Sequence, residues 1–199
     1  MNADPITTGM TTEPTGVGGA VGVSGAKWFV AIVKHNTEKA VGEKLTKMGY
    51  ETYVPIQTEY KVWRNGRKAK VDRVVIPSVV FIRCTERERR VVVTSPFVNR
   101  FMTNKAGSVE GFTHKPLAII PDQQIATLKF MLGYSETPVT IVPTVYKHGD
   151  KVRVIRGGLR GLEGEVLNFN GDKTELIVSI GILGCAKLMI ETINLQRAS

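Results

Sequence analysis

The sequence has only two cysteines, Cys84 and Cys185, and three histidines. No histidine stands at metal-ligand spacing from either cysteine, so the sequence indicates neither a disulfide framework nor a zinc site. We expect both thiols to be reduced and buried, as is usual in a cytoplasmic protein. The histidines, His35, His114 and His148, lie in separate segments without a nucleophile or a paired acid beside them. We therefore predict no enzyme activity, no metal and no cofactor.

Long apolar runs are also missing. No stretch approaches the roughly 18 apolar residues of a membrane-spanning helix, and residues 1–25 lack the basic start and apolar core of a signal peptide. We expect a soluble, cytoplasmic protein without a membrane partner. Residues 1–26 contain no Lys, no Arg and no aromatic residue, and we predict a disordered tail. Translation starting at Met1 and translation starting at Met10 are both compatible with such a tail.

Positive charge is concentrated in one part of the chain. The sequence has 27 Lys and Arg against 18 Asp and Glu, a net charge of +9. Residues 27–104 hold 16 of the bases and 7 of the acids, whereas residues 1–26 carry a net −2 and residues 105–199 a net +2. A basic surface steers toward phosphates and gains free energy from counterion release. The middle segment therefore favours an anionic partner.

Residues 27–132 mix strand and helix patterns. The apolar run 28–33 predicts a buried strand. Asn36 and Thr37 are candidate caps of a following helix, with Glu38 in its first turn and Gly49 at its C-terminus. The hairpin signal is Asn65-Gly66, which tolerates the positive φ angles of a tight turn between strands 57–63 and 68–76. Further strands are expected at 50–55, 77–83 and 97–103, and further helices at 85–93 and from residue 122. This mixture predicts an α+β domain with helices packed on an antiparallel sheet.

The pattern changes after residue 132. Residues 133–146 hold two prolines and no helical period, which predicts a linker. Beyond it, short strand patterns separated by Gly, Asn and Asp turns lie at 151–155, 163–169, 175–180, 185–190 and 193–195. They predict a small all-β, SH3-like barrel that closes on itself. We expect a monomer with a tail (1–26), an α+β domain (27–132), a linker (133–146) and a barrel (147–197).

Two segments carry a resemblance to a known family. Residues 147–166 resemble the KOW motif of NusG proteins and of ribosomal protein L24. In it, valines alternate toward a barrel core and glycines let the loop between two strands turn sharply. These residues are Val152, Val154, Val166, Gly157, Gly161 and Gly164.

The second resemblance lies in the N-terminal half. Residues 27–30, the helix after them, residues 53–55, the basic hairpin and residues 75–82 follow the order and spacing of a NusG N-terminal domain. Together the two resemblances cover about residues 27–197. They imply a transcription elongation or antitermination factor that binds RNA polymerase and has no chemistry of its own.

One segment departs from the family's pattern. The family commonly has two aromatics, Pro, Gly and Tyr where this chain has Val75, Ile76, Pro77, Ser78 and Val79. The patch stays apolar, but its aliphatic side chains favour a specialised paralog. The sequence is most similar to the UpxY-type regulators of capsular polysaccharide operons in Bacteroides and to RfaH-like paralogs. A general housekeeping NusG and a ribosome-associated KOW RNA-binding protein remain alternatives.

The resemblance also implies three sets of binding residues. The apolar surface for the clamp helices of the largest polymerase subunit consists of Trp28, Ile76, Val79 and Phe101. The residues for non-template DNA or nascent RNA are Lys34, His35, Lys39, Lys44, Arg64, Arg67 and Lys68. The KOW loop residues for ribosomal protein S10 or the Rho factor are Leu162, Ile182 and Leu183, which we expect to be exposed. Each set has a simpler explanation: core packing, a solvated charged face or a small satellite core. Trp63 is either a packing residue of the hairpin or a stacking platform for bases, and we expect it to pack within the hairpin.

Overall fold

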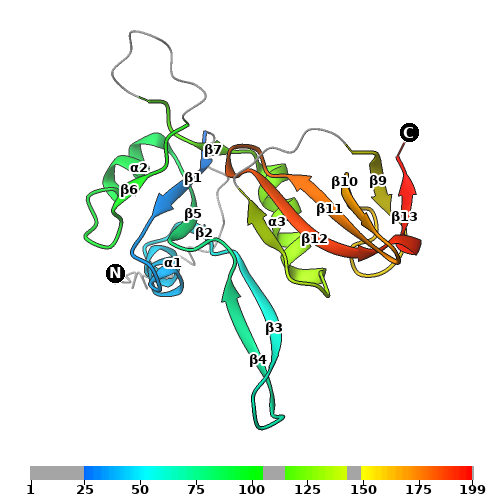
Figure 1. The fold of residues 1–199 in the computed structure, drawn as a ribbon. Helices are drawn as coiled ribbons and strands as arrows, with labels where there is room; N and C mark the ends of the chain where they lie inside the picture. Colours follow the sequence, from blue (N-terminus) through cyan, green and yellow to red (C-terminus); the bar gives the residue numbers. More distant parts are fainter. Residues whose placement is uncertain (1–24, 105–114, 143–148, 199) are drawn as a thin grey trace, which may run out of the picture.

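The computed structural model describes residues 25–104, 115–142 and 149–198 (Figure 1). The predicted tail lies outside these residues except for Gly25 and Ala26, as do His114 and His148. The N-terminal half is α+β and the C-terminal part is β-rich, as the sequence predicts.

The N-terminal sheet is centred on β1 (Lys27–Ile32), which pairs antiparallel with β5 (Val79–Cys84). Its order is β2-β5-β1-β6, and β7 also pairs with β1. The outer strands are β2 (Glu51–Tyr53), β6 (Arg100–Phe101) and β7 (Ile119–Ile120). Because side chains alternate along a strand, β1 contributes to two cores. Phe29 and Ala31 belong to one hydrophobic cluster, and Trp28 and Val30 to the other.

Two helices cover one face of this sheet. They are α1 (Glu38–Lys47) and α2 (Glu86–Val92). Helix α2 begins with a capping box, in which the Thr85 side chain accepts from the Glu88 N–H and Glu88 accepts from the Thr85 N–H. Helix α1 begins after Thr37, whose side chain makes no cap hydrogen bond, and Gly49 just beyond it has a positive φ of 94°. The expected end of this helix is therefore confirmed, whereas its expected side-chain cap is wrong.

The basic hairpin consists of β3 (Ile56–Val62) and β4 (Lys68–Val74), which form their own two-stranded sheet. It projects away from the rest of the molecule (Figure 1). The Trp63 N–H donates to the Arg67 carbonyl, and among the residues between them only Gly66 has a positive φ. The turn is therefore a three-residue loop at the predicted place, and of the Asn65-Gly66 pair only Gly66 adopts a positive φ.

The C-terminal sheet is antiparallel, with the order β13-β9-β10-β11-β12-β8. Its strands are β8 (Thr140–Val142), β9 (Lys151–Val154), β10 (Glu163–Asn170), β11 (Lys173–Ser179), β12 (Cys185–Glu191) and β13 (Leu195–Arg197). Two short 3-10 helices, Gly181–Leu183 and Thr192–Asn194, flank β12. Strand β8 comes from the segment predicted as a linker, so part of that segment is built into the sheet.

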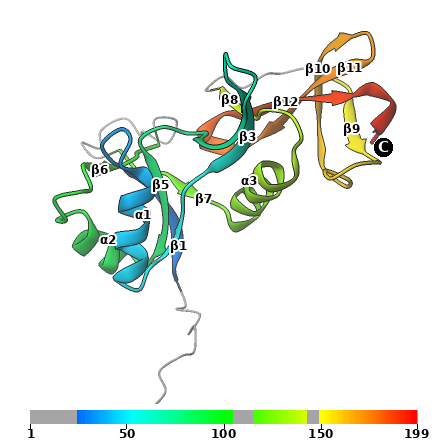
Figure 2. The ribbon, with the colours of Figure 1, turned by 90° about the horizontal axis from the view of Figure 1, so that it is seen from below.

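Helix α3 (Asp122–Tyr134) lies between the two sheets, as Figures 1 and 2 both show. Its buried residues are Ile125, Leu128, Met131 and Leu132. They belong to a continuous hydrophobic cluster that includes residues of both sheets. The α+β domain and the C-terminal sheet therefore pack against each other through α3.

Both cysteines are free and buried, which confirms the sequence prediction. Burial raises the pKa of the Cys84 thiol to about 12, so this thiol is protonated at neutral pH.

Candidate nucleic-acid and partner interfaces

Helix α1 and the hairpin are joined at one charged contact. The Lys39 ammonium donates to Asp72 on β4 at 3.2 Å, and the Thr58 hydroxyl of β3 donates to the other oxygen of Asp72 at 2.9 Å. A surface groove lies beside this contact, and its walls include Thr46, Lys47 and Thr52. The predicted DNA-binding helix and the basic hairpin thus form adjoining walls of one surface.

The predicted cations of α1 do not all lie on that surface. Lys44 sits over the Phe97 ring, 5.5 Å from its centroid, on the flank toward the segment after α2. Lys34 and His35 are exposed just before the N-terminus of α1. Of the four predicted residues Lys34, His35, Lys39 and Lys44, only Lys39 contacts the hairpin in the described part of the chain.

A buried carboxylate fixes the start of α1. Glu38 is almost fully buried and accepts a 2.6 Å hydrogen bond from the N–H of Ser78, a non-glycine residue with a positive φ of 62°. Burial opposes ionisation, but the backbone N–H groups of Ser78, Glu38 and Asn36 and the nearby His35 outweigh it and hold the Glu38 pKa below its usual 4.5. The sequence pattern had marked Glu38 only as a first-turn acid.

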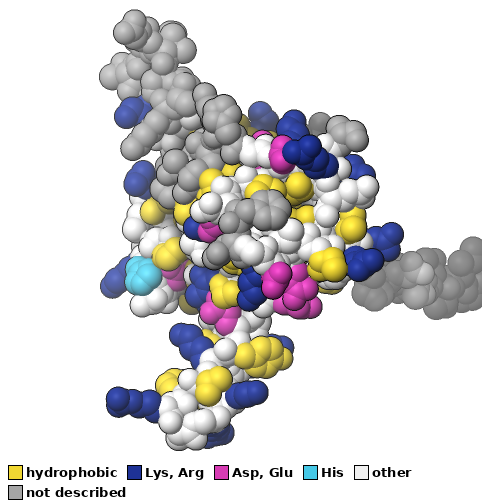
Figure 3. Space-filling view, turned by 45° about the vertical axis from the view of Figure 1, so that its right-hand side comes forward, with side chains coloured by type: hydrophobic (Ala, Val, Ile, Leu, Met, Phe, Trp, Pro, Cys, Tyr) yellow, Lys and Arg dark blue, Asp and Glu magenta, His cyan; other side chains and the backbone are white. Residues whose placement is uncertain are grey.

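The outer half of the hairpin is exposed and basic. Arg64, Arg67 and Lys68 are all solvent-exposed. Trp63 is 57% exposed, so the expectation that it packs within the hairpin is wrong. In Figure 3 the projecting hairpin carries Lys, Arg and hydrophobic side chains, with the acidic ones gathered near its base.

The predicted polymerase-binding residues fall on two faces of the N-terminal sheet. Trp28 and Val79 are buried, and Ile76 is partly buried in the same cluster, on the side of α3. The Trp28 indole N–H donates to Asp122 of α3 at 2.9 Å. Phe101 is buried on the opposite face, edge-on to Phe29. In this conformation Trp28, Val79 and Phe101 are core residues and not a shared surface.

The predicted partner residues of the C-terminal sheet are also covered. Leu162 and Leu183 are only 5% and 9% exposed, and Ile182 packs partly buried against the same cluster. The expectation of an exposed patch is therefore wrong for this conformation. The loop that holds Ile182 and Leu183 lies against α3. A Cβ added at Gly181 of this loop would lie only 2.6 Å from the Gln124 side chain of α3. Sequence alone gave no sign of this contact, since α3 lies far away in the chain.

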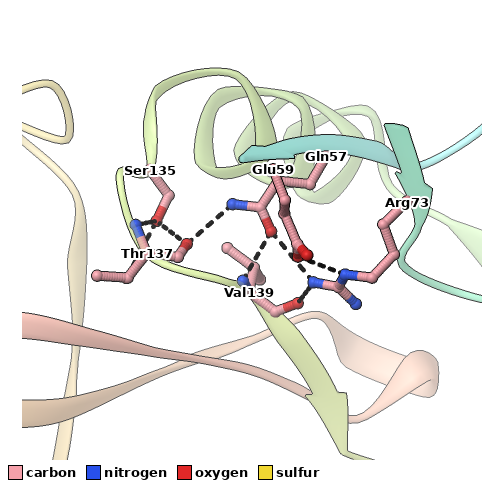
Figure 4. Close-up of polar contacts among 6 residues, drawn as sticks. All are labelled: Gln57, Glu59, Arg73, Ser135, Thr137 and Val139. Carbon is pink, nitrogen blue, oxygen red and sulfur yellow. Dashed lines mark hydrogen bonds and ion pairs between the residues drawn. The ribbon is translucent and has the colours of Figure 1, made fainter. Parts of the chain in front are cut away.

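A polar cluster ties the hairpin base to the segment after α3 (Figure 4). The Gln57 amide is buried, donating to the Thr137 carbonyl and accepting from the Val139 N–H, each at 2.8 Å. Arg73 donates to the Val139 carbonyl at 2.9 Å and pairs with Glu59. The Thr137 hydroxyl in turn donates to the Met189 carbonyl of β12 at 2.8 Å. We call Gln57, Arg73, Thr137 and Val139 the hairpin-base cluster.

The described residues contain no helix long and apolar enough to cross a membrane. Nor do these residues bring together three or more His, Cys, Asp or Glu side chains that could hold a metal ion.

Comparisons with known proteins give one consistent result. A sequence model of the family described as "Transcription termination factor nusG" matches residues 26–129. The chain is similar to "Transcription termination/antitermination protein NusG" of Staphylococcus carnosus, with 29% identity over 155 residues, covering 76% of this chain and 80% of the relative. The protein of that name from Streptococcus pyogenes serotype M1 is 26% identical over 165 residues, covering 77% and 86%. Among solved structures, "Domain interaction in Thermotoga maritima NusG" aligns with a TM-score of 0.50 at 17% identity, covering 87% of this chain and 98% of that one.

Proposed function

Because the chain belongs to the NusG family, we propose that it is a transcription elongation and antitermination factor that binds RNA polymerase through its N-terminal domain. The observation that carries this proposal is the family match over residues 26–129, which spans the N-terminal sheet and most of α3. The factor acts by binding and not by catalysis, as the family's proteins do.

The polymerase contact proposed here is the apolar sheet face around Ile76. Ile76 is the one predicted residue of that set that is not fully buried. Trp28 and Val79 are buried in the cluster against which Ile76 packs, and Phe101 is buried on the opposite face of the sheet. The proposed binding partner is the clamp-helix region of the largest polymerase subunit.

The second partner is proposed to bind the loops that hold Leu162, Ile182 and Leu183. Ribosomal protein S10 and the Rho factor are the two candidates. These residues and the polymerase face belong to one buried cluster with α3. Binding of the second partner therefore requires the C-terminal sheet to separate from α3, and polymerase binding requires α3 to leave the face around Ile76. We call the state in which α3 and the C-terminal sheet are packed over this face the closed arrangement.

Nucleic acid is the third proposed partner. Exposed cations at the start of α1 and on the hairpin face solvent, and the segment 27–104 carries the chain's net charge. We propose that they contact non-template DNA or nascent RNA in the transcribing complex.

The more specific part of the proposal is that the protein acts at a single operon. The aliphatic segment 75–79 supports a specialised paralog acting on capsular polysaccharide genes, with a general NusG as the alternative. Deleting the gene and sequencing total RNA separates the two. Transcript loss confined to the distal genes of one operon is expected, and a genome-wide change would assign the general role.

Polymerase association itself is tested by affinity purification of the tagged full chain from its own cells. The polymerase subunits are expected to co-purify. Ribosomal subunits without polymerase would contradict the proposal and favour a ribosome-associated RNA-binding protein.

A further inference from the structure

The outer half of the hairpin combines exposed apolar side chains with positive charge. From Tyr60 to Val71 the sequence has five Lys or Arg residues and no acid. Tyr60 is 75% exposed, Val62 64% and Trp63 57%. Large exposed apolar side chains next to uncompensated cations fit a ligand that offers both flat apolar surface and negative charge.

The strand register sorts these side chains onto two faces. Tyr60 lies opposite Lys70, and Val62 lies opposite Lys68. Directly opposed residues of an antiparallel pair share a face, and successive residues alternate. Tyr60, Val62, Lys68 and Lys70 therefore form one face, which we call the Tyr60 face. Trp63 lies on the other face, with Lys61 and Arg67.

The Tyr60 face is continuous with the surface of α1. The next opposed pair toward the hairpin base on the same face is Thr58 and Asp72. Asp72 is the residue that accepts from Lys39 of α1. Lys70 also acts on Asp72 electrostatically, so one carboxylate stands among cations from both elements. Cations thus run from the groove beside α1 along the Tyr60 face to the hairpin tip.

We propose that the Tyr60 face is a binding site for single-stranded nucleic acid, in which an unpaired base stacks on the Tyr60 ring and phosphates contact Lys68 and Lys70. An exposed ring stacks only on a base that is not already stacked within a duplex. A two-stranded ribbon also fits the major groove of a duplex, but there the base edges offer hydrogen-bonding groups and not flat faces. The site rests on the proposed function only for the source of the strand, non-template DNA or nascent RNA.

Binding is measured with the purified full chain and a labelled, unstructured oligonucleotide, as DNA and as RNA, by fluorescence anisotropy. Replacing Tyr60 by Ala is expected to raise Kd by about 5- to 150-fold, because stacking contributes about 1–3 kcal/mol per base. Tyr60→Phe keeps the ring and is expected to bind like the wild type. Trp63→Ala removes an exposed ring from the other face and serves as the matched control, with Kd expected to stay within about twofold of the wild type.

The charged part of the site is tested by salt dependence. Changing Lys68 and Lys70 to Gln should lower the slope of log Kd against log salt by about 1.4, since each phosphate contact to a single strand contributes about 0.7. Changing Arg87 and Arg90 to Gln removes equal charge from exposed positions on α2, outside the proposed sites, and should change the slope less. Three results would overturn the site. They are an equal change of slope for the two charge pairs, an equal rise in Kd for Tyr60→Ala and Trp63→Ala, and tighter binding to a duplex than to single strands.

The oligonucleotide-binding measurement tests the Tyr60 site, and the co-purification of polymerase tests the proposed function. The two measurements are independent of each other. Circular dichroism of Tyr60→Ala should match the wild type because Tyr60 is exposed. If the wild type binds the oligonucleotide through Tyr60 but does not retain polymerase, the site stands and the proposed function fails. If it retains polymerase but Tyr60→Ala binds the oligonucleotide as well as the wild type, the site is wrong and the proposed function stands.

Discussion

At the scale of single residues, two buried polar side chains fix contacts between segments far apart in the chain. Gln57 bridges the hairpin to the segment after α3, and Glu38 holds the positive-φ residue Ser78. A buried polar group is tolerated only when its hydrogen bonds are made, so each of these side chains fixes one local geometry.

Replacing Gln57 by Leu removes the acceptor of the Val139 N–H and the donor to the Thr137 carbonyl. Because leaving a buried backbone donor without its partner is costly, the free energy of unfolding should fall by about 1–3 kcal/mol. Urea unfolding followed by circular dichroism measures this change. Gln196→Leu, at an exposed site on β13, is the control and should shift it by less than about 0.5 kcal/mol.

Glu38 makes stability depend on pH. Its pKa in the folded protein lies below 4.5, so its ionised form stabilises the fold above that pH, and this contribution is lost as the pH falls through the folded-state pKa. Glu38→Gln should therefore be less stable than the wild type at about pH 6, and the difference should shrink toward about pH 3. The other acids with lowered pKa values are present in both proteins and cancel. A difference that stays constant over this range would show that Glu38 does not titrate as described.

Residue exposure is what the sequence predicted least well. Leu162 and Leu183 are buried in a cluster that the C-terminal sheet shares with α3, a helix distant in the chain, and no local pattern reports such packing. Trp63 is exposed because the hairpin projects away from both sheets. Cysteine burial, by contrast, could be predicted because Cys84 ends an apolar strand and Cys185 begins one.

At the scale of elements, the glycines Gly157, Gly161 and Gly164 have different roles. Gly157 and Gly161 have positive φ values of 79° and 92°, as a sharp turn requires. Gly164 lies within β10, where a Cβ would meet the Ile177 carbonyl oxygen at 2.6 Å. The sequence grouped all three as turn residues, whereas the structure shows that Gly164 is needed for close approach of two strands.

Gly164→Ala should therefore destabilise the C-terminal sheet more than Gly161→Ala. The first forces paired backbones apart and should cost toward the upper end of about 1–3 kcal/mol. The second adds a Cβ in open space at a positive φ and should cost about 1 kcal/mol. Thermal unfolding of the two variants gives the order. A larger loss for Gly161→Ala would mean that backbone conformation outweighs packing here.

Element types were largely predictable, and element ends less so. The strands of the C-terminal sheet follow the alternating patterns within a few residues. Strand β8 was missed because its pairing partner β12 lies some forty positions further along the chain. Strand β6 is only two residues long, although residues 97–103 read as a full strand, because only Arg100 and Phe101 pair with β1.

At the scale of the whole molecule, the closed arrangement places both proposed protein-binding regions in one hydrophobic cluster. The hairpin-base cluster adds hydrogen bonds that hold the segment leading into β8. A binding-competent state that is only a small fraction of the population lowers apparent affinity by that fraction. Weakening the closed arrangement should therefore strengthen polymerase binding.

Titration of RNA polymerase with the wild type and with Gln57→Leu tests the central claim most directly. Gln57→Leu should bind at least about fivefold more tightly, because a loss of about 1 kcal/mol from the closed arrangement raises the open fraction by that factor. Gln196→Leu should bind like the wild type. Equal affinities for all three proteins would contradict a closed arrangement that covers the polymerase face, and no binding by any of them would contradict the polymerase partner itself.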